Sequence, residues 1–308
     1  MLADRTLAGT GAYMQETERW PDAELVLDAG ARLGEGPVWD EEAGVLVWVD
    51  ILGPAVHLYR PSDGSDRVIP VPSPVGAAAL REAGGLLLAL EDGFWLRDAD
   101  GTMRLLAPVE AGDRSTRMND GRVDPAGRFY CGTMAYDERP GAGALYRLDP
   151  DGHVERILDR ATISNGIDWS PDGQRCWYID TPTMGVDRFD YERETGALAN
   201  RHRVATIPDG QGFPDGLTVD AEGGAWVAFW DGWCVRRYLP DGTLDRVVRV
   251  PVARVTSCAF GGRQLDELYI TTAWNGLSAA EREEQPHAGG LFRARPGVRG
   301  LPARRFRG

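Results

Sequence analysis

The sequence contains no lysine, so all 34 basic side chains among its 308 residues are arginine. This absence excludes a Schiff-base lysine and a phosphate-loop lysine. The sequence also lacks a Gly-x-Ser-x-Gly elbow, which argues against a serine hydrolase. Only four histidines are present, and they fall at unrelated positions of the repeat described below. We therefore expect them to be solvated or internally hydrogen-bonded side chains rather than metal ligands.

Cysteines are few and scattered, with no Cys-x-x-Cys pair among Cys131, Cys176, Cys234 and Cys258. Three of them lie within apolar runs, where buried free thiols are expected, and nothing indicates a disulfide framework. Residues 1–20 have no apolar segment typical of a signal peptide, and no run approaches the ~18 apolar residues of a membrane span. We expect a cytoplasmic protein without membrane contact.

The net charge of -13 argues against a nucleic-acid partner, which requires a basic face. Hydrophobic residues make up 43% of the chain, enough for a substantial core. We divide the chain into a loose N-terminal arm, residues 1–22, and one large domain, residues 23–308. The sequence does not fix the oligomeric state, and a monomer or a small homo-oligomer is expected.

One local pattern recurs along this domain: an oxygen-bearing side chain stands directly before a glycine, as in Glu35, Asp120, Asn165 and Asp215. After each glycine come a short, partly apolar stretch, a turn containing glycine and a strongly apolar run. Units of this kind start at residues 36, 77, 121, 166, 216 and 258, in steps of 41, 44, 45, 50 and 42. A period of 40 to 50 residues with several short strands per unit is typical of a β-propeller.

The fold predicted from this period is all-β, a six-bladed β-propeller. Asp-Gly and Pro-Asp-Gly turns separate the apolar runs, as in hairpins. The runs are apolar on both faces, which suits strands packed between neighbouring blades. Residues 23–27 are expected to close the ring as the outer strand of the sixth blade, and residues 278–281 have the spacing of a helix capping box. The alternative, two β-sandwich domains, would need a linker that the middle of the chain lacks.

In a propeller the first strand of each blade lines the central channel, so residues at one register converge on the axis. Glu35, Asp120, Asn165 and Asp215 share that register, and Asn119 is one step away. Carboxylate and amide oxygens without histidine or thiolate form a site for a hard divalent cation. Without an ion the carboxylates would repel each other and take up a proton. Each Asp-Gly or Asn-Gly pair alone would indicate only a turn.

At these residues the sequence resembles the family of regucalcin (senescence marker protein), gluconolactonase and luciferin-regenerating enzyme. The resemblance spans about residues 23–306. The matching stretches are LGEGPVW (33–39), NDGRVDPAGR (119–128), GTM (132–134), SNGI (164–167), FPDGL (213–217) and TSCAFGG (256–262).

The resemblance implies a six-bladed propeller with one divalent cation in its channel, bound by Glu35, Asn165 and Asp215. Calcium fits an all-oxygen ligand set best, while Zn²⁺, Mg²⁺ and Mn²⁺ remain open. By the same resemblance Arg117 and Asn119 would contact the substrate. Related propellers use an asparagine at the place of Asn119 as a metal ligand, so both roles are open. Asp137 matches a family glutamate near the substrate, although its side chain is shorter.

The activity that this resemblance implies is hydrolysis of a five- or six-carbon sugar lactone to the aldonic acid. The cation would polarise the ester carbonyl, Asp215 would act as the base toward water, and Arg117 would stabilise the developing oxyanion. Two other functions remain: calcium binding without catalysis, and phosphotriester hydrolysis by the same metal site. A propeller like strictosidine synthase agrees less well with the asparagine and aspartate pattern.

Overall fold

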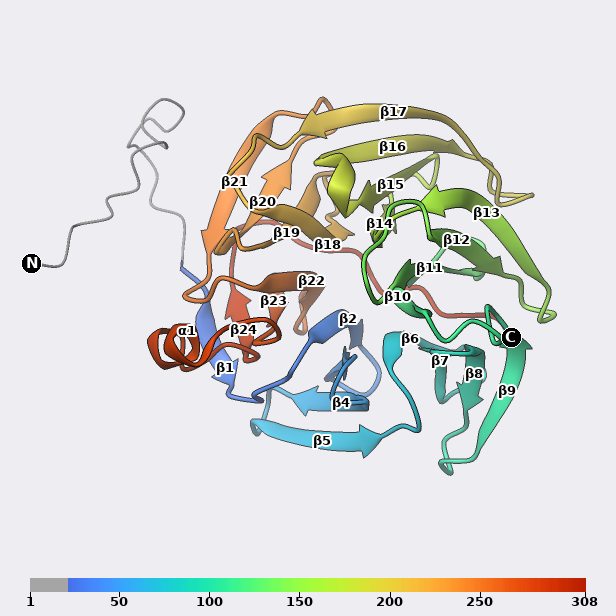
Figure 1. Cartoon of the computed structure of the whole chain (residues 1–308), viewed down its shortest axis with the longest axis horizontal. Coiled ribbons are helices and arrows are strands. Elements are labelled where there is room, and N and C mark those ends of the chain that lie inside the picture. The colour runs from blue at the N-terminus through green and yellow to red at the C-terminus, as the bar shows by residue number, and fades with distance from the viewer. Residues whose placement is uncertain (1–21) are drawn as a thin grey trace, which may run out of the picture.

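The computed structural model describes residues 22–308, so the predicted arm lies outside the described residues apart from Asp22. The chain forms six antiparallel sheets of four strands each. Figure 1 shows these sheets as blades arranged in a ring around a central axis. The predicted six-bladed propeller is confirmed.

The strands of each blade succeed one another from the axis outward. The innermost strands are β2 (Gly34–Asp40), β6 (Val75–Leu80), β10 (Thr116–Val123), β14 (Ser164–Trp169), β18 (Phe213–Val219) and β22 (Val255–Gly261). The second strands are β3 (Val45–Asp50), β7 (Leu86–Leu90), β11 (Phe129–Ala135), β15 (Arg175–Asp180), β19 (Ala225–Trp230) and β23 (Glu267–Thr272). The third strands are β4 (Ala55–Arg60), β8 (Gly93–Arg97), β12 (Gly143–Leu148), β16 (Gly185–Tyr191), β20 (Cys234–Tyr238) and β24 (Leu291–Ala294). The outer strands are β5 (Ser65–Pro70), β9 (Met103–Pro108), β13 (Val154–Ala161), β17 (Leu198–Thr206), β21 (Leu244–Arg249) and β1 (Glu24–Leu27).

The apolar core lies between the blades. Its buried side chains form clusters that each join two neighbouring blades, as where Tyr130 of the third blade packs with Trp169 of the fourth. Strands of the inner layers are therefore buried on both faces, in agreement with their uninterrupted apolar sequences. The outer strands β13 and β17 are largely exposed. All four cysteines are buried free thiols, as expected.

Two segments close the ring. At the start of the described chain, β1 pairs with β24 and becomes the outer strand of the sixth blade, as predicted. At the other end, residues 298–308 cross the ring from the sixth blade toward the second and third blades (Figure 1). This C-terminal segment pairs with Asp220 through Gly300 and with Arg81 through Phe306, whose side chain is fully buried. The repeat pattern ended at β24 and gave no indication of this crossing.

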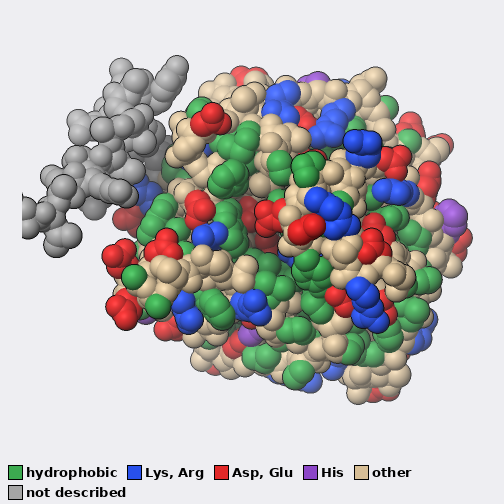
Figure 2. All heavy atoms as spheres, in the orientation of Figure 1, with side chains coloured by type: hydrophobic (Ala, Val, Ile, Leu, Met, Phe, Trp, Pro, Cys, Tyr) green, Lys and Arg blue, Asp and Glu red, His purple; other side chains and the backbone are tan. Residues whose placement is uncertain are grey.

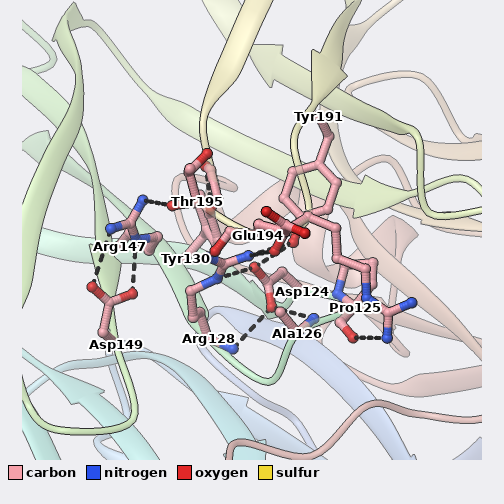
Figure 3. Close-up of polar contacts among 12 residues, drawn as sticks. Asp124, Pro125, Ala126, Arg128, Tyr130, Arg147, Asp149, Tyr191, Glu194 and Thr195 are labelled. Carbon is pink, nitrogen blue, oxygen red and sulfur yellow. Dashed lines mark hydrogen bonds and ion pairs between the residues drawn. The ribbon is translucent and has the colours of Figure 1, made fainter.

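A buried ion pair of the third blade is hydrogen-bonded to a tyrosine of the fourth blade (Figure 3). Asp124 accepts hydrogen bonds from Arg128 Nε at 2.7 Å and from the Tyr191 hydroxyl at 2.7 Å. Its other oxygen accepts the main-chain N–H groups of Ala126 and Arg128. We call Asp124, Arg128 and Tyr191 the blade clasp. Each Asp124 oxygen is bonded at least twice, so burial leaves this carboxylate fully compensated.

Helix is confined to short connections in the described part of the chain. The predicted capping box forms: Ser278 caps α1 (Ala279–Glu284) and Glu281 returns a bond to the Ser278 N–H. A 3₁₀ turn, η1 (Thr181–Thr183), links β15 to β16. Across residues 22–308, no helix is long and apolar enough to cross a membrane.

Candidate functional site

The predicted site register coincides with an irregularity in strand pairing. In β10, β14 and β18 two residues stand opposite one residue of the neighbouring strand: Asn119-Asp120, Asn165-Gly166 and Asp215-Gly216. In β2 the extra residue follows Glu35 directly. A bulge bends the strand and redirects its side chains. In these four inner strands the polar-glycine pair therefore lies at a bulge or directly beside one.

The glycines serve this geometry in two ways. A Cβ atom on Gly166 would lie 2.8 Å from the Asp215 carbonyl, and one on Gly216 would lie 2.2 Å from Ser257 Oγ. Only glycine permits adjacent inner strands to approach this closely. Gly36 is less crowded, but it has a φ of +52°, which favours glycine.

Three carboxylates, Glu35, Asp120 and Asp215, meet at the axis, and we call them the axial carboxylate cluster. Their exposed fractions are 5%, 5% and 7%. Burial raises the pKa of Glu35 well above its ordinary range, and the charges of Asp215 and Asp120 raise it further. Burial and the charge of Asp120 likewise raise the pKa of Asp215. Figure 2 shows acidic side chains in a recess at the centre of the ring.

Asp120 differs from the other two carboxylates because a second arginine lies close to it. Burial raises the Asp120 pKa to about 6, while the positive charge of Arg122 opposes this shift. Arg122 donates to the carbonyl oxygens of Pro37 and Leu217, and so connects three inner strands across the channel. Asp120 therefore has a cationic neighbour in Arg122, while Arg117 is the cation whose positive charge acts on Glu35 and Asp215.

A row of polar side chains runs beside the cluster. Arg117 Nη1 donates to Asn119 Oδ1 at 2.7 Å, and Asn119 Nδ2 donates to Asn165 Oδ1 at 2.8 Å. Asn165 Nδ2 donates to Thr181 Oγ1 at 2.8 Å, and the Thr181 hydroxyl donates to the Pro214 carbonyl at 2.8 Å. The row thus joins the third, fourth and fifth blades.

The site fits a hard divalent cation. Two of its proposed ligands, Glu35 and Asp215, are buried carboxylates that repel each other, and Asn165 offers an amide oxygen that can accept more than its one bond. Among residues 22–308, no three His, Cys, Asp or Glu side chains are grouped so that they could hold a metal. Amide, main-chain or water oxygens must therefore complete the ligand set, as is usual for calcium.

The structure brings five of the six predicted site residues together: Glu35, Arg117, Asn119, Asn165 and Asp215, all buried. Asp137 lies outside this group. Its side chain is 65% exposed and pairs with Arg139 in the loop after β11. The same loop carries Glu138, whose negative charge reaches Arg117, so Asp137 lies near the rim of the site rather than within it.

Thr181 was missed by the sequence reasoning, and no local signal could have found it. It lies in the connection between β15 and β16 and reaches Asn165 only because the blade folds back on itself. Ser257, which the sequence analysis covers only as part of the matching stretch 256–262, stands directly before the start of the sixth unit. Its fully buried hydroxyl has no hydrogen-bond partner in the structure, at the register of Asp215.

Comparison with known proteins agrees with this architecture. Residues 33–274 match the family described as SMP-30/gluconolactonase/LRE-like region. The putative sugar lactone lactonase YvrE of Bacillus subtilis is 41% identical over 277 residues, covering 89% of this chain and 94% of that protein. The crystal structure of a calcium-binding protein, regucalcin, from Agrobacterium tumefaciens superposes with a TM-score of 0.90 at 30% identity, covering 94% of this chain and 98% of the other. A gluconolactonase structure from Xanthomonas campestris gives 0.71 at 27% identity, covering 87% of each chain. The chain belongs to the SMP-30/gluconolactonase/LRE-like family.

Proposed function

We propose that this protein is a metal-dependent lactonase that hydrolyses a sugar lactone to the aldonic acid. The observation that carries the proposal is the axial carboxylate cluster, in which buried carboxylates repel each other beside a buried arginine and two amides. Such an arrangement costs stability unless a cation compensates it, and costly polar groups of this kind are typical of functional sites. The names of the Bacillus and Xanthomonas relatives support a lactone as the substrate class.

Glu35, Asn165 and Asp215 would hold one divalent cation. When bound, the cation acts as a Lewis acid that polarises the lactone carbonyl. Calcium fits the oxygen donors best, and the name of the Agrobacterium relative supports it. Asp120 would not bind the ion itself. Its charge interacts with that of Arg122, and it adds negative charge next to the metal ligands.

Asp215 is the proposed general base. It accepts a proton from the water that attacks the carbonyl carbon, and returns a proton to the ring oxygen when the carbon–oxygen bond breaks. The products are then a carboxylic acid and a free hydroxyl on the same chain. Burial raises the pKa of Asp215, which makes it a stronger base than an exposed aspartate. A bound cation offsets part of this gain because it favours the anion.

Arg117 and Asn119 are proposed to bind the substrate. The bonds of Arg117 to Met118 and Asn119 use only Nη1, so Nε and Nη2 can donate to a sugar hydroxyl or to the developing oxyanion. Two aromatic side chains are exposed in segments that adjoin site strands: Tyr136 in the loop after β11, and Phe213 at the start of β18, two residues before Asp215. They offer apolar faces against which a sugar ring can lie.

A pH-indicator assay tests this function, because opening a lactone releases acid. Five- and six-carbon aldonolactones are tested as substrates in the presence of calcium, of Zn²⁺, Mg²⁺ or Mn²⁺, or of a chelator. We expect turnover of at least one lactone, lost in chelator and restored by a divalent ion. Absence of turnover on every lactone, with calcium bound, would leave calcium binding without catalysis as the function.

Phosphotriester hydrolysis is tested in the same experiment by adding a phosphotriester with a coloured leaving group. The chemistry of the site permits this reaction, since the same cation would polarise a phosphoryl oxygen. We expect the lactone to be the better substrate by kcat/KM. The reverse order would overturn the substrate class while keeping the metal site.

A further inference from the structure

The polar row beside the cluster has a fixed direction. It begins at the Arg117 guanidinium, which can only donate hydrogen bonds, and ends at the Pro214 carbonyl, which can only accept them. Each side chain between these two ends must therefore accept a hydrogen bond from the Arg117 side of the row and donate one toward Pro214. Side-chain amides are otherwise free to turn over, since their two ends differ little in shape.

The orientation of Asn165 follows from this direction. The Thr181 hydroxyl donates its hydrogen to the Pro214 carbonyl, so toward Asn165 it can only accept a hydrogen bond. Only the Nδ2 end of Asn165 can satisfy these, and it does so at 2.8 Å. The Asn165 oxygen is consequently turned the other way, toward the side-chain amide of Asn119. A cation binds an amide through oxygen and is repelled by the N–H end.

Thr181 is well placed to impose this orientation. It is 8% exposed and begins the 3₁₀ turn η1, and its main chain is anchored at both ends. Its N–H donates to the Ile163 carbonyl at 3.2 Å, and its carbonyl accepts from Met184 at 3.0 Å. The carbonyl that its hydroxyl contacts belongs to Pro214, the residue before Asp215. One hydroxyl thus connects the proposed ligand of the fourth blade to the strand that carries the proposed ligand of the fifth.

We propose that Thr181 is a positioning residue of the metal site. Its hydroxyl holds the Asn165 amide with the oxygen toward the cation, and fixes β18 at the distance from β14 that places Asn165 and Asp215 on one ion. The inference rests on the proposed metal site, but it concerns a residue that touches neither the ion nor the substrate. Residues that orient metal ligands typically affect metal affinity by about 10- to 100-fold.

The test replaces Thr181 with valine, which has the same shape and lacks the hydroxyl, and with serine, which keeps it. Thr183→Val is the matched control, because Thr183 lies in the same turn and donates only to the Asp180 carbonyl. Calcium affinity is measured by titration calorimetry on the full chain. We expect Thr181→Val to bind calcium about 10- to 100-fold more weakly, and Thr181→Ser and Thr183→Val to bind as the wild type does.

A second measurement separates positioning from structural support. Thermal melting in chelator reports the stability of the ion-free fold, and the calcium dependence of kcat reports the site. A positioning role requires that excess calcium restore much of the kcat of Thr181→Val. Wild-type calcium affinity in Thr181→Val overturns the proposal, as does equal weakening in Thr183→Val. If the valine variant does not fold, the calcium affinities of Thr181→Ala and Thr181→Ser are compared instead. Weaker binding in Thr181→Ala alone supports the positioning role, and equal binding in the two variants overturns it.

The two proposals fail separately. A wild-type protein that binds calcium but opens no lactone refutes the reaction, while the affinity comparison still decides the role of Thr181. Wild-type affinity in Thr181→Val refutes the positioning role and leaves lactone turnover by the wild type unaffected. A wild-type protein that binds no divalent ion refutes the metal site and the role of Thr181 together.

Discussion

Asp120 and Asp124 stand four residues apart on one stretch of chain, both nearly inaccessible, yet their surroundings are opposite. Asp124, in the blade clasp, accepts bonds from Arg128, Tyr191 and two main-chain N–H groups (Figure 3). Asp120 accepts a hydrogen bond from the Gly121 N–H and lies close to the carboxylates of Glu35 and Asp215. The Asp124 carboxylate is satisfied within the protein, whereas the carboxylates of the axial carboxylate cluster repel one another.

The fifth blade repeats this contrast between neighbours. Asp215 belongs to the axial carboxylate cluster, whereas Asp220 is fully buried and bonded to Arg237 Nε at 2.7 Å and to Trp226 Nε1 at 2.8 Å. Two blades thus place an aspartate with few hydrogen-bond partners at the start of the channel and a fully bonded one in the turn that follows. The difference shows that burial alone does not identify a functional carboxylate; its missing partners do.

Removing the proposed base should have the largest effect. We expect Asp215→Asn to lower kcat for lactone hydrolysis by about 10²- to 10⁴-fold, the usual contribution of a general base. Rates are measured with calcium in excess, and bound calcium is determined by metal analysis. Wild-type rates in a variant that retains its metal would show that Asp215 is not the base.

Breaking the clasp should act on stability instead of rate. Asp124→Ala leaves Arg128 buried without its carboxylate, and we expect the free energy of unfolding to fall by about 3–5 kcal/mol. Denaturant unfolding measures this loss, with Asp63→Ala, an exposed turn position, as the control. At temperatures where the variant is folded, kcat should equal that of the wild type. A loss of activity without a loss of stability would contradict the division between the two regions.

Calcium should stabilise the axial carboxylate cluster in a pH-dependent way. At about 100 times its dissociation constant, a ligand of the folded state adds about 2.7 kcal/mol. Glu35 and Asp215 have raised pKa values, so protons compete with the ion at low pH. We therefore expect a larger calcium-induced rise in Tm at neutral pH than near pH 5. An equal rise at both pH values would indicate that calcium binds elsewhere.

Asp120 should make the calcium-free protein less stable as the pH rises. Its pKa is raised from 3.8 to about 6 in the folded state, so the folded protein binds the proton more tightly than the unfolded chain does. The stabilisation of the folded state by this proton is complete below pH 3.8 and is lost as the pH rises through about 6. Each pKa unit corresponds to about 1.4 kcal/mol.

The measurement for Asp120 is the difference in unfolding free energy between the wild type and Asp120→Asn, in chelator, from pH 4.5 to 7.5. The amide does not titrate, so the wild type should lose stability relative to the variant across this range. A difference that stays flat would mean that Arg122 compensates the Asp120 charge fully.

Asp137 should give the smallest effect. Its carboxylate is mostly exposed and pairs with Arg139, and exposed pairs of this kind contribute little. We expect Asp137→Ala to leave kcat and KM for the best lactone unchanged, with Asp159→Ala as an exposed ion-pair control. A rise in KM confined to Asp137→Ala would show that Asp137 contacts the bound substrate, as the family resemblance implies.

Much of the fold could be predicted because its determinants are local. Turn glycines, apolar runs and a period of 40 to 50 residues specify hairpins whose strands must be buried on both faces, and a closed ring of blades satisfies that requirement. The closure by β1 followed from the need to complete the sixth blade. The C-terminal segment could not be predicted, since its pairing with Arg81 and Asp220 depends on blades far away in the sequence.

The sequence by itself determined the six-bladed ring and the register at which Glu35, Asn165 and Asp215 converge, because a repeated unit carries equivalent residues to equivalent places. Only the tertiary structure decided which aspartates have partners. Asp120 and Asp124 are the same residue type in one short stretch, and their difference arises from Arg128 and Tyr191, the latter from another blade. The contact of Thr181 with Asn165 likewise exists only after the fourth blade has folded, since it joins residues 16 positions apart that no sequence period relates.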